Sequence, residues 1–73
     1  MRYAIVIERA GSNFSAYVPD LPGCAATGAS QREVEKLLRE AIELHLAGMC
    51  EDSLPIPEPS SKVEYLDVEI AAP

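Results

Sequence analysis

The chain has 73 residues, which is the size of one small domain. Apolar residues make up 48% of it and charged residues 25%, a balance typical of a folded globular domain rather than a disordered segment. No apolar run is long enough to span a membrane, and the apolar run after Arg2 meets charges too soon for a signal peptide. We therefore expect a cytoplasmic protein with no membrane association.

The net charge of −6 is unevenly distributed. Residues 51–73 contain six acidic residues and one lysine, a net charge of −5, whereas residues 1–50 carry −1. Such acidity repels phosphate backbones and favours a basic partner, although solubility is the simpler interpretation of charge alone. With only six lysines and arginines and no basic stripe, the sequence predicts no direct nucleic-acid binding.

The N-terminal part of the chain has the alternating pattern of β-strands. Residues 2–9 and 14–18 predict two strands, each with an apolar face. Residues 10–13 form a short turn signal that includes Gly11, so the two strands should pair as an antiparallel hairpin. Residues 24–27 predict a short third strand of small side chains.

A helix is predicted over residues 31–47. Ser30 and Glu33 have the spacing of a capping box, and Gly48 is the expected stop. The apolar stripe expected to face the sheet has helical spacing and consists of Val34, Leu37, Leu38, Ala41, Ile42, His45 and Leu46. We interpret the single histidine of this stripe as a packed or half-exposed residue rather than a general base.

The remaining chain divides into a linker and a last strand. The alternating prolines in residues 51–61 favour a stiff, extended spacer over a proline-rich ligand for a partner domain. Residues 62–71 predict the last strand, with Leu66, Val68 and Ile70 on one face.

Together these elements predict a single α+β domain over residues 1–73, in the order β-β-β-α-β. One helix packs on a small mixed sheet of three to four strands, with the last strand parallel to the first. The first three strands and the helix occupy residues 1–50, the linker 51–61 and the last strand 62–71. Because one helix cannot cover both faces of a sheet and the edges stay open, we expect a homo-oligomer, either a dimer or a tetramer.

The densest turn signal lies between the second and third strands. Two prolines bracket two residues, and a glycine and a cysteine follow at once: Pro19, Asp20, Leu21, Pro22, Gly23 and Cys24. Proline fixes φ, and glycine adopts backbone conformations closed to other residues. We expect a sharp corner here, and we prefer to interpret Asp20 as a turn-capping carboxylate that accepts backbone amides rather than as a recognition residue.

This corner, with Phe14-Ser15-Ala16-Tyr17-Val18 before it and Thr27-Gly28-Ala29-Ser30 after it, resembles the HicB family of antitoxin-type proteins. The resemblance extends from Tyr3 to Ser60, and Gly28, Ser30 and Glu33 complete the structural motif. It implies a partial ribonuclease-H-like fold and a non-catalytic module that neutralises a HicA-type RNA-cleaving toxin by covering its surface. The candidates for contact with such a partner are Tyr17, Asp20, Glu58, Glu64, Asp67 and Glu69.

Two further expectations qualify this hypothesis. Full-length members carry an additional DNA-binding domain that is absent from this sequence, so operator binding is not expected. The alternative to an antitoxin is a solitary domain that forms a homo-oligomer, with no toxin partner and an unknown ligand.

The sequence offers little for catalysis. Glu8 and Asp20 are the only carboxylates on the first three predicted strands and their turns, too few for the metal cluster of a ribonuclease-H-type enzyme. Cys24 and Cys50 match no metal-ligand spacing, and we interpret both as small buried hydrophobic residues. We therefore predict no enzymatic activity, metal or cofactor.

Overall fold

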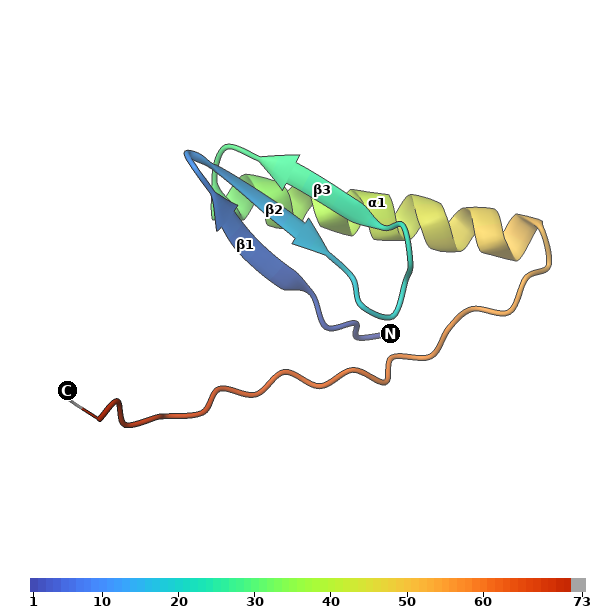
Figure 1. Cartoon of the computed structure of the whole chain (residues 1–73). Helices are drawn as coiled ribbons and strands as arrows, with labels where there is room; N and C mark the ends of the chain where they lie inside the picture. Colours follow the sequence, from blue (N-terminus) through green and yellow to red (C-terminus); the bar gives the residue numbers. More distant parts are fainter. Residues whose placement is uncertain (72–73) are drawn as a thin grey trace.

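The computed structural model describes residues 1–71. Three strands precede one helix: β1 (Val6–Ala10), β2 (Asn13–Tyr17), β3 (Ala25–Gly28) and α1 (Gln31–Glu51). The strands form an antiparallel sheet in the order β1-β2-β3, and α1 packs against one face of it (Figure 1). The predicted α+β class and the order of these four elements are confirmed.

The hairpin of β1 and β2 turns through Gly11 and Ser12, because Ala10 is paired with Asn13. Gly11 has a φ of 62°, in the left-handed region that glycine adopts without steric cost. Since side chains alternate along a strand, this register fixes the whole apolar face of the sheet.

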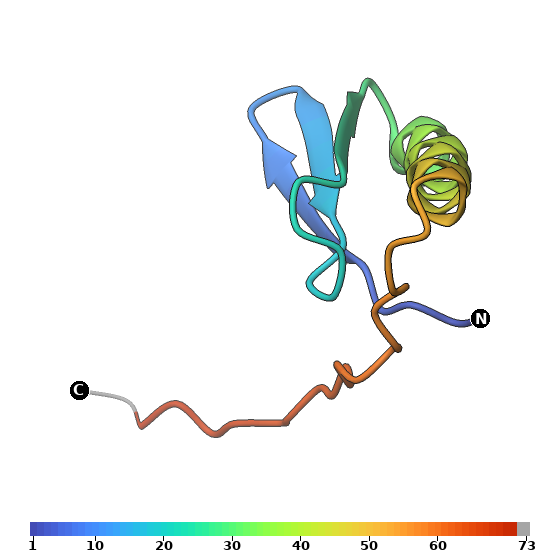
Figure 2. The same ribbon diagram turned by 90° about the vertical axis from the view of Figure 1, so that its right-hand side faces the viewer.

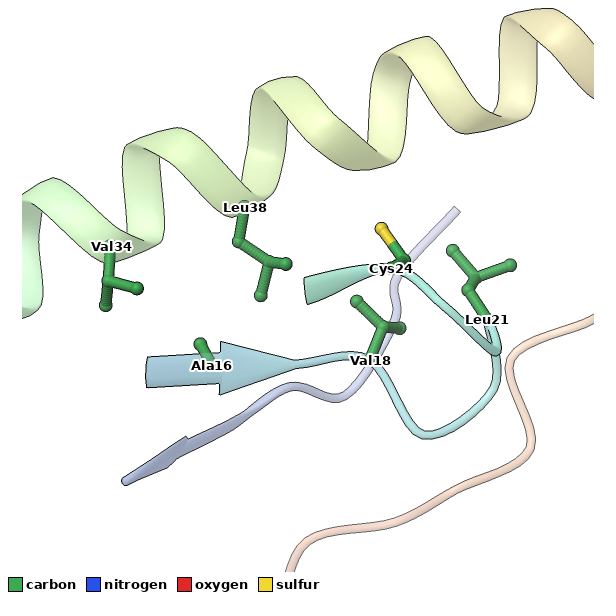
Figure 3. Packing of buried hydrophobic residues seen from close by; sticks show 6 residues of the cluster. All are labelled: Ala16, Val18, Leu21, Cys24, Val34 and Leu38. Carbon is green, nitrogen blue, oxygen red and sulfur yellow. The ribbon is translucent and has the colours of Figure 1, made fainter. Parts of the chain in front are cut away.

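The core lies between this face and α1. Ala16 and Val18 come from β2 and its continuation, and Val34 and Leu38 reach down from the helix (Figure 3). Leu21, Val34 and Leu38 are completely buried. Partly buried apolar side chains then pack around this cluster: Tyr3, Ile5, Ile7, Phe14, Ala26, Ala41, Ile42 and Leu46.

The helix begins where the capping box predicts. The hydroxyl of Ser30 accepts a hydrogen bond from the amide of Glu33 at 3.1 Å, and the Glu33 carboxylate accepts one from the amide of Ala29 at 3.3 Å. The predicted stop at Gly48 is wrong, because the helix continues to Glu51. Glycine lowers helix stability without forbidding it, and the helix ends only where Ser53 takes a positive φ of 55°.

The predicted strand at residues 62–71 is not formed. This segment is extended and exposed along its whole length, and it pairs with no strand among residues 1–71. The described sheet is therefore antiparallel and three-stranded rather than mixed. An alternating pattern shows that a segment is able to form a strand, but a strand also needs an edge to pair with.

The helix covers the sheet unevenly. It packs against β3 and β2, and β1 lies farthest from it (Figure 2). The helix-facing side of β1 is thus only partly covered, and one β1 edge is unpaired among the described residues.

Candidate protein-binding surface

The corner between β2 and β3 is held by its own backbone. The amide of Val18 donates to the carbonyl of Cys24, and the amide of Cys24 donates to the carbonyl of Leu21, both at 3.1 Å. Gly23 adopts a φ of 84°, which explains the glycine at this position. The corner turns Leu21 and Cys24 into the core beside Leu38 (Figure 3). The predicted motif therefore has a structural role.

Asp20 points from this corner to a distant part of the chain. Its carboxylate accepts hydrogen bonds from the amides of Ser60 and Ser61, at 2.9 and 3.0 Å. The two serine hydroxyls donate to the same carboxylate, at 3.1 and 2.8 Å. We call these three residues the Asp20 anchor. The prediction that Asp20 caps its own turn is wrong, because the backbone amides that donate to it belong to Ser60 and Ser61.

The anchor stabilises the charged form of the Asp20 carboxylate. Hydrogen bonds from the Ser61 amide, and then from the Ser60 amide, lower the pKa of Asp20 from 3.8 to about 2. The carboxylate is therefore ionised at neutral pH, and all four of its hydrogen bonds are charge-assisted.

A second contact fixes the linker to the body of the domain. The hydroxyl of Tyr3 donates to the carbonyl of Pro57. Ile56 and Pro57 are half-buried, whereas the neighbouring linker residues are exposed. The linker thus runs over the open side of the domain along a defined path, from the end of α1 to the Asp20 anchor (Figure 1).

Beyond the anchor, residues 62–71 form a segment rich in exposed apolar side chains. We call residues 62–71 the C-terminal segment. Tyr65, Leu66, Val68 and Ile70 are 91%, 84%, 77% and 92% exposed. Monomeric domains seldom leave such a run of large apolar residues in water, so the segment is a candidate contact surface.

Two hollows flank the uncovered side of β1. One, of about 480 Å³, separates the start of the chain from the helix. Apolar and charged residues both line it: Met1, Arg2, Tyr3, Ile5, Glu35, Leu38, Arg39, Ile42, Glu43 and Leu46. The other, of about 320 Å³, is lined by Ile5, Ile7, Arg9, Phe14, Gln31 and Tyr65. The guanidinium of Arg9 lies 5.7 Å from the centre of the Phe14 ring, a cation–π distance.

The six predicted contact residues do not form one cluster. Tyr17 lies on β2, 44% exposed, and Asp20 is engaged in the anchor. The exposed Glu58 lies in the linker. Glu64, Asp67 and Glu69 are all exposed on the C-terminal segment, so these three remain free for a partner.

Sequence reasoning missed the residues that hold the linker. Ser60 and Ser61 are about forty positions from Asp20, and Tyr3 is 54 positions from Pro57. No local pattern connects positions so far apart. The one local feature that could have indicated this contact is the pair of adjacent serines after the last linker proline. Adjacent serines are equally typical of an ordinary loop.

The two cysteines differ from each other. Cys24 is buried, as predicted, and burial raises the pKa of its thiol, which lowers the fraction present as the reactive thiolate. Cys50 is exposed, so its predicted burial is wrong. Within residues 1–71, no group of three or more histidine, cysteine or acidic side chains could hold a metal ion. Within the same residues, no helix has the length and apolar character that crossing a membrane requires.

The arrangement therefore offers an acidic and apolar extended segment, anchored beside an open sheet edge, and such a surface suits protein recognition. A family model described as the HicB_like antitoxin of bacterial toxin-antitoxin systems matches residues 3–70. The chain belongs to the HicB-like antitoxin family. The match includes the corner, the helix, the linker and most of the C-terminal segment.

Relatives of this HicB-like chain extend the comparison. An uncharacterised 14.9 kDa protein of Haemophilus phage HP1 is 34% identical over 67 residues, which cover 92% of this chain and 50% of the phage protein. A UPF0150 protein of Helicobacter pylori is 41% identical over 49 residues, or 67% of this chain and 68% of that protein. The chain thus spans half the length of its phage relative.

A solved structure shares the HicB-like fold. A chain of the HicA3 and HicB3 toxin-antitoxin complex superposes with a TM-score of 0.69 at 28% identity. The match covers 82% of this chain and 70% of that one.

Proposed function

We propose that this HicB-like chain neutralises a small, basic, RNA-cleaving toxin of the HicA type by covering the toxin's surface. The observation that carries the proposal is the set of exposed acidic residues on the C-terminal segment, Glu64, Asp67 and Glu69, in a chain of an antitoxin family. A toxin that binds RNA needs a cationic surface, and this acidic segment complements it in charge. The likeness to a chain of a toxin-antitoxin complex supports the same pairing.

The mechanism is occlusion without catalysis. Bound along the toxin's cationic face, the acidic segment takes the place that the RNA phosphates would occupy. The Asp20 anchor and the Tyr3 contact hold the linker on the domain, so less conformational entropy is lost when the segment binds. The exposed ring of Tyr17 on β2 and Glu58 in the linker are further contact candidates.

The test is direct binding between this chain and the product of the neighbouring gene. We expect a complex at low salt whose affinity falls steeply as salt rises, measured by calorimetry at several salt concentrations. The double variant Asp67→Asn/Glu69→Gln should weaken the complex by about tenfold and flatten its salt dependence. Absence of any complex at low salt would contradict the proposal.

A matched control uses the same change of charge elsewhere. Glu40 and Glu51 are exposed on α1, outside both hollows beside β1. The variant Glu40→Gln/Glu51→Gln should bind the toxin as the wild-type chain does. An equal loss of affinity in both variants would show that overall charge, rather than this segment, governs binding.

A homo-oligomer without a toxin partner is the second candidate, and the exposed apolar side of the C-terminal segment favours it. Light scattering over a range of concentrations, with and without the candidate toxin, separates the two functions. Self-association that the toxin leaves unchanged, with no complex formed, would favour the second.

A further inference from the structure

Two parts of the described chain each lack a pairing partner: the C-terminal segment and one edge of β1. Leu66, Val68 and Ile70 form an apolar side of an extended segment, at least 77% exposed, and this segment pairs with no strand in the described chain. The other feature is β1, which pairs with β2 along one edge only. Exposed strand edges and exposed alternating segments both favour intermolecular pairing, and proteins normally cover them.

The edge of β1 is better suited to receive a strand than the edge of β3. The helix packs on β3 and β2, so the helix-facing side of β1 stays partly open (Figure 2). Ile5 and Ile7 are only partly buried, because each packs against the core and also lines a hollow. A strand added beside β1 would extend the sheet and place apolar side chains over these two residues.

We propose that the C-terminal segment of one copy adds as a strand to the free β1 edge of a second copy, so that two chains exchange these segments. At about 3.3 Å per residue, residues 62–71 exceed the length of β1, and they reach the whole edge. Leu66, Val68 and Ile70 then cover Ile5 and Ile7 of the other copy.

Strand direction favours a second copy over the chain's own β1. Tyr17 at the end of β2 pairs with Val6 at the start of β1, and the Asp20 anchor follows Tyr17 closely in the chain. From the anchor, the segment runs in the same general direction as its own β1, and Tyr65 lines the hollow that Ile5, Ile7 and Arg9 also line (Figure 1). A second copy is free to present its segment antiparallel, the direction that pairs more stably.

Charge complementarity also indicates a second copy. Along an extended segment Glu64 shares a side with Leu66, and along β1 Arg9 shares a side with Ile7. Covering Ile7 with this side of the segment therefore brings the Glu64 carboxylate of one copy toward the Arg9 guanidinium of the other. Both complementary surfaces belong to the same chain. A two-fold dimer therefore makes the same contact twice and is closed, because each copy uses both its segment and its β1 edge.

This exchange rests on the self-association considered above and not on toxin binding. Along an extended segment, Asp67 and Glu69 lie on the side opposite Leu66, Val68 and Ile70. The acidic side would thus remain accessible to a toxin while the apolar side is buried in the dimer.

The decisive experiment mixes isotopically labelled and unlabelled full-length chains and records NMR contacts between different chains. We expect a dimer by light scattering, with contacts from the methyl groups of Leu66, Val68 and Ile70 to those of Ile5 and Ile7 in the other chain. A monomer would overturn the proposal, whether its segment folds onto its own β1 or stays free in solution. So would a dimer without these contacts.

A matched pair of substitutions tests the energetics. Leu66→Asp should raise the dimer dissociation constant about a hundredfold or more, because both symmetric contacts lose a buried leucine. Leu44 is 76% exposed on α1, outside both hollows, so Leu44→Asp should leave dimerisation unchanged. Circular dichroism confirms that each variant is folded. If Leu66→Asp dimerises as the wild-type chain does, the exchange is refuted.

Toxin binding is recorded in parallel on the same samples. A dimer with these contacts that binds no toxin would preserve the exchange and remove the proposed function. A monomer that binds the toxin would refute the exchange and support the proposed function.

Discussion

The carboxylate of Asp20 and the amide nitrogen of Ser60 lie 2.9 Å apart, although the two residues are separated by 40 positions in the sequence. This contact joins the corner after β2 to the end of the linker. It decides where the C-terminal segment leaves the domain.

Replacing Asp20 with asparagine should release the linker without unfolding the domain. The amide side chain keeps one acceptor oxygen but loses the charge and the second acceptor that the four hydrogen bonds use. We expect faster hydrogen exchange at the amides of Ser60 and Ser61, with unchanged protection in α1. Asp67→Asn removes the same charge from an exposed residue and should leave those two amides unaffected.

The anchor should open in acid. The pKa of Asp20 is lowered in the folded chain, to about 2 from 3.8, so the unfolded chain binds more protons between these values. The contribution of the anchor to stability is therefore complete above pH 3.8 and is lost as the pH falls through about 2. An NMR titration of the Asp20 carboxyl carbon should give this low midpoint, and Asp20 titrating near 3.8 would show that the anchor does not form in solution.

Truncating Leu38 should be strongly destabilising. Its side chain is completely buried between α1 and the corner (Figure 3). We expect Leu38→Ala to lower the free energy of unfolding by about 2–5 kcal/mol, measured by denaturant titration. Leu44→Ala, on the exposed face of the same helix, should change it by less than about 0.5 kcal/mol. Similar losses for both leucines would contradict the observed packing.

Alanine substitutions at Gly28 and Gly48 should change the stability of the domain in opposite directions. A Cβ on Gly28 would lie 3.0 Å from the backbone nitrogen of Val34, so Gly28→Ala should destabilise the domain by about 1–3 kcal/mol. A Cβ on Gly48 meets nothing within 4 Å, and this glycine lies inside the helix. Gly48→Ala should therefore stabilise the domain by about 0.5–1 kcal/mol. Thermal unfolding of both variants measures the difference, and a Gly28→Ala variant as stable as the wild type would show that the helix is free to shift.

Local patterns in the sequence were sufficient for the first four elements. The hairpin, the third strand and the start of the helix follow from the alternation of apolar residues, from Gly11 and from the capping box of Ser30 and Glu33. Each of these signals acts over a few residues, where backbone geometry and nearby hydrogen bonds decide the conformation. The resemblance carried by the corner motif gave the family.

The tertiary structure alone decided what the rest of the chain does. The helix passes Gly48 because one glycine costs less than the following helical turn contributes. Residues 62–71 alternate as a strand should, yet they remain unpaired, because pairing depends on an edge and not on the segment itself. The partner of Asp20 could not be predicted from the sequence either, because a hydrogen bond across 40 positions depends on the path of the folded chain.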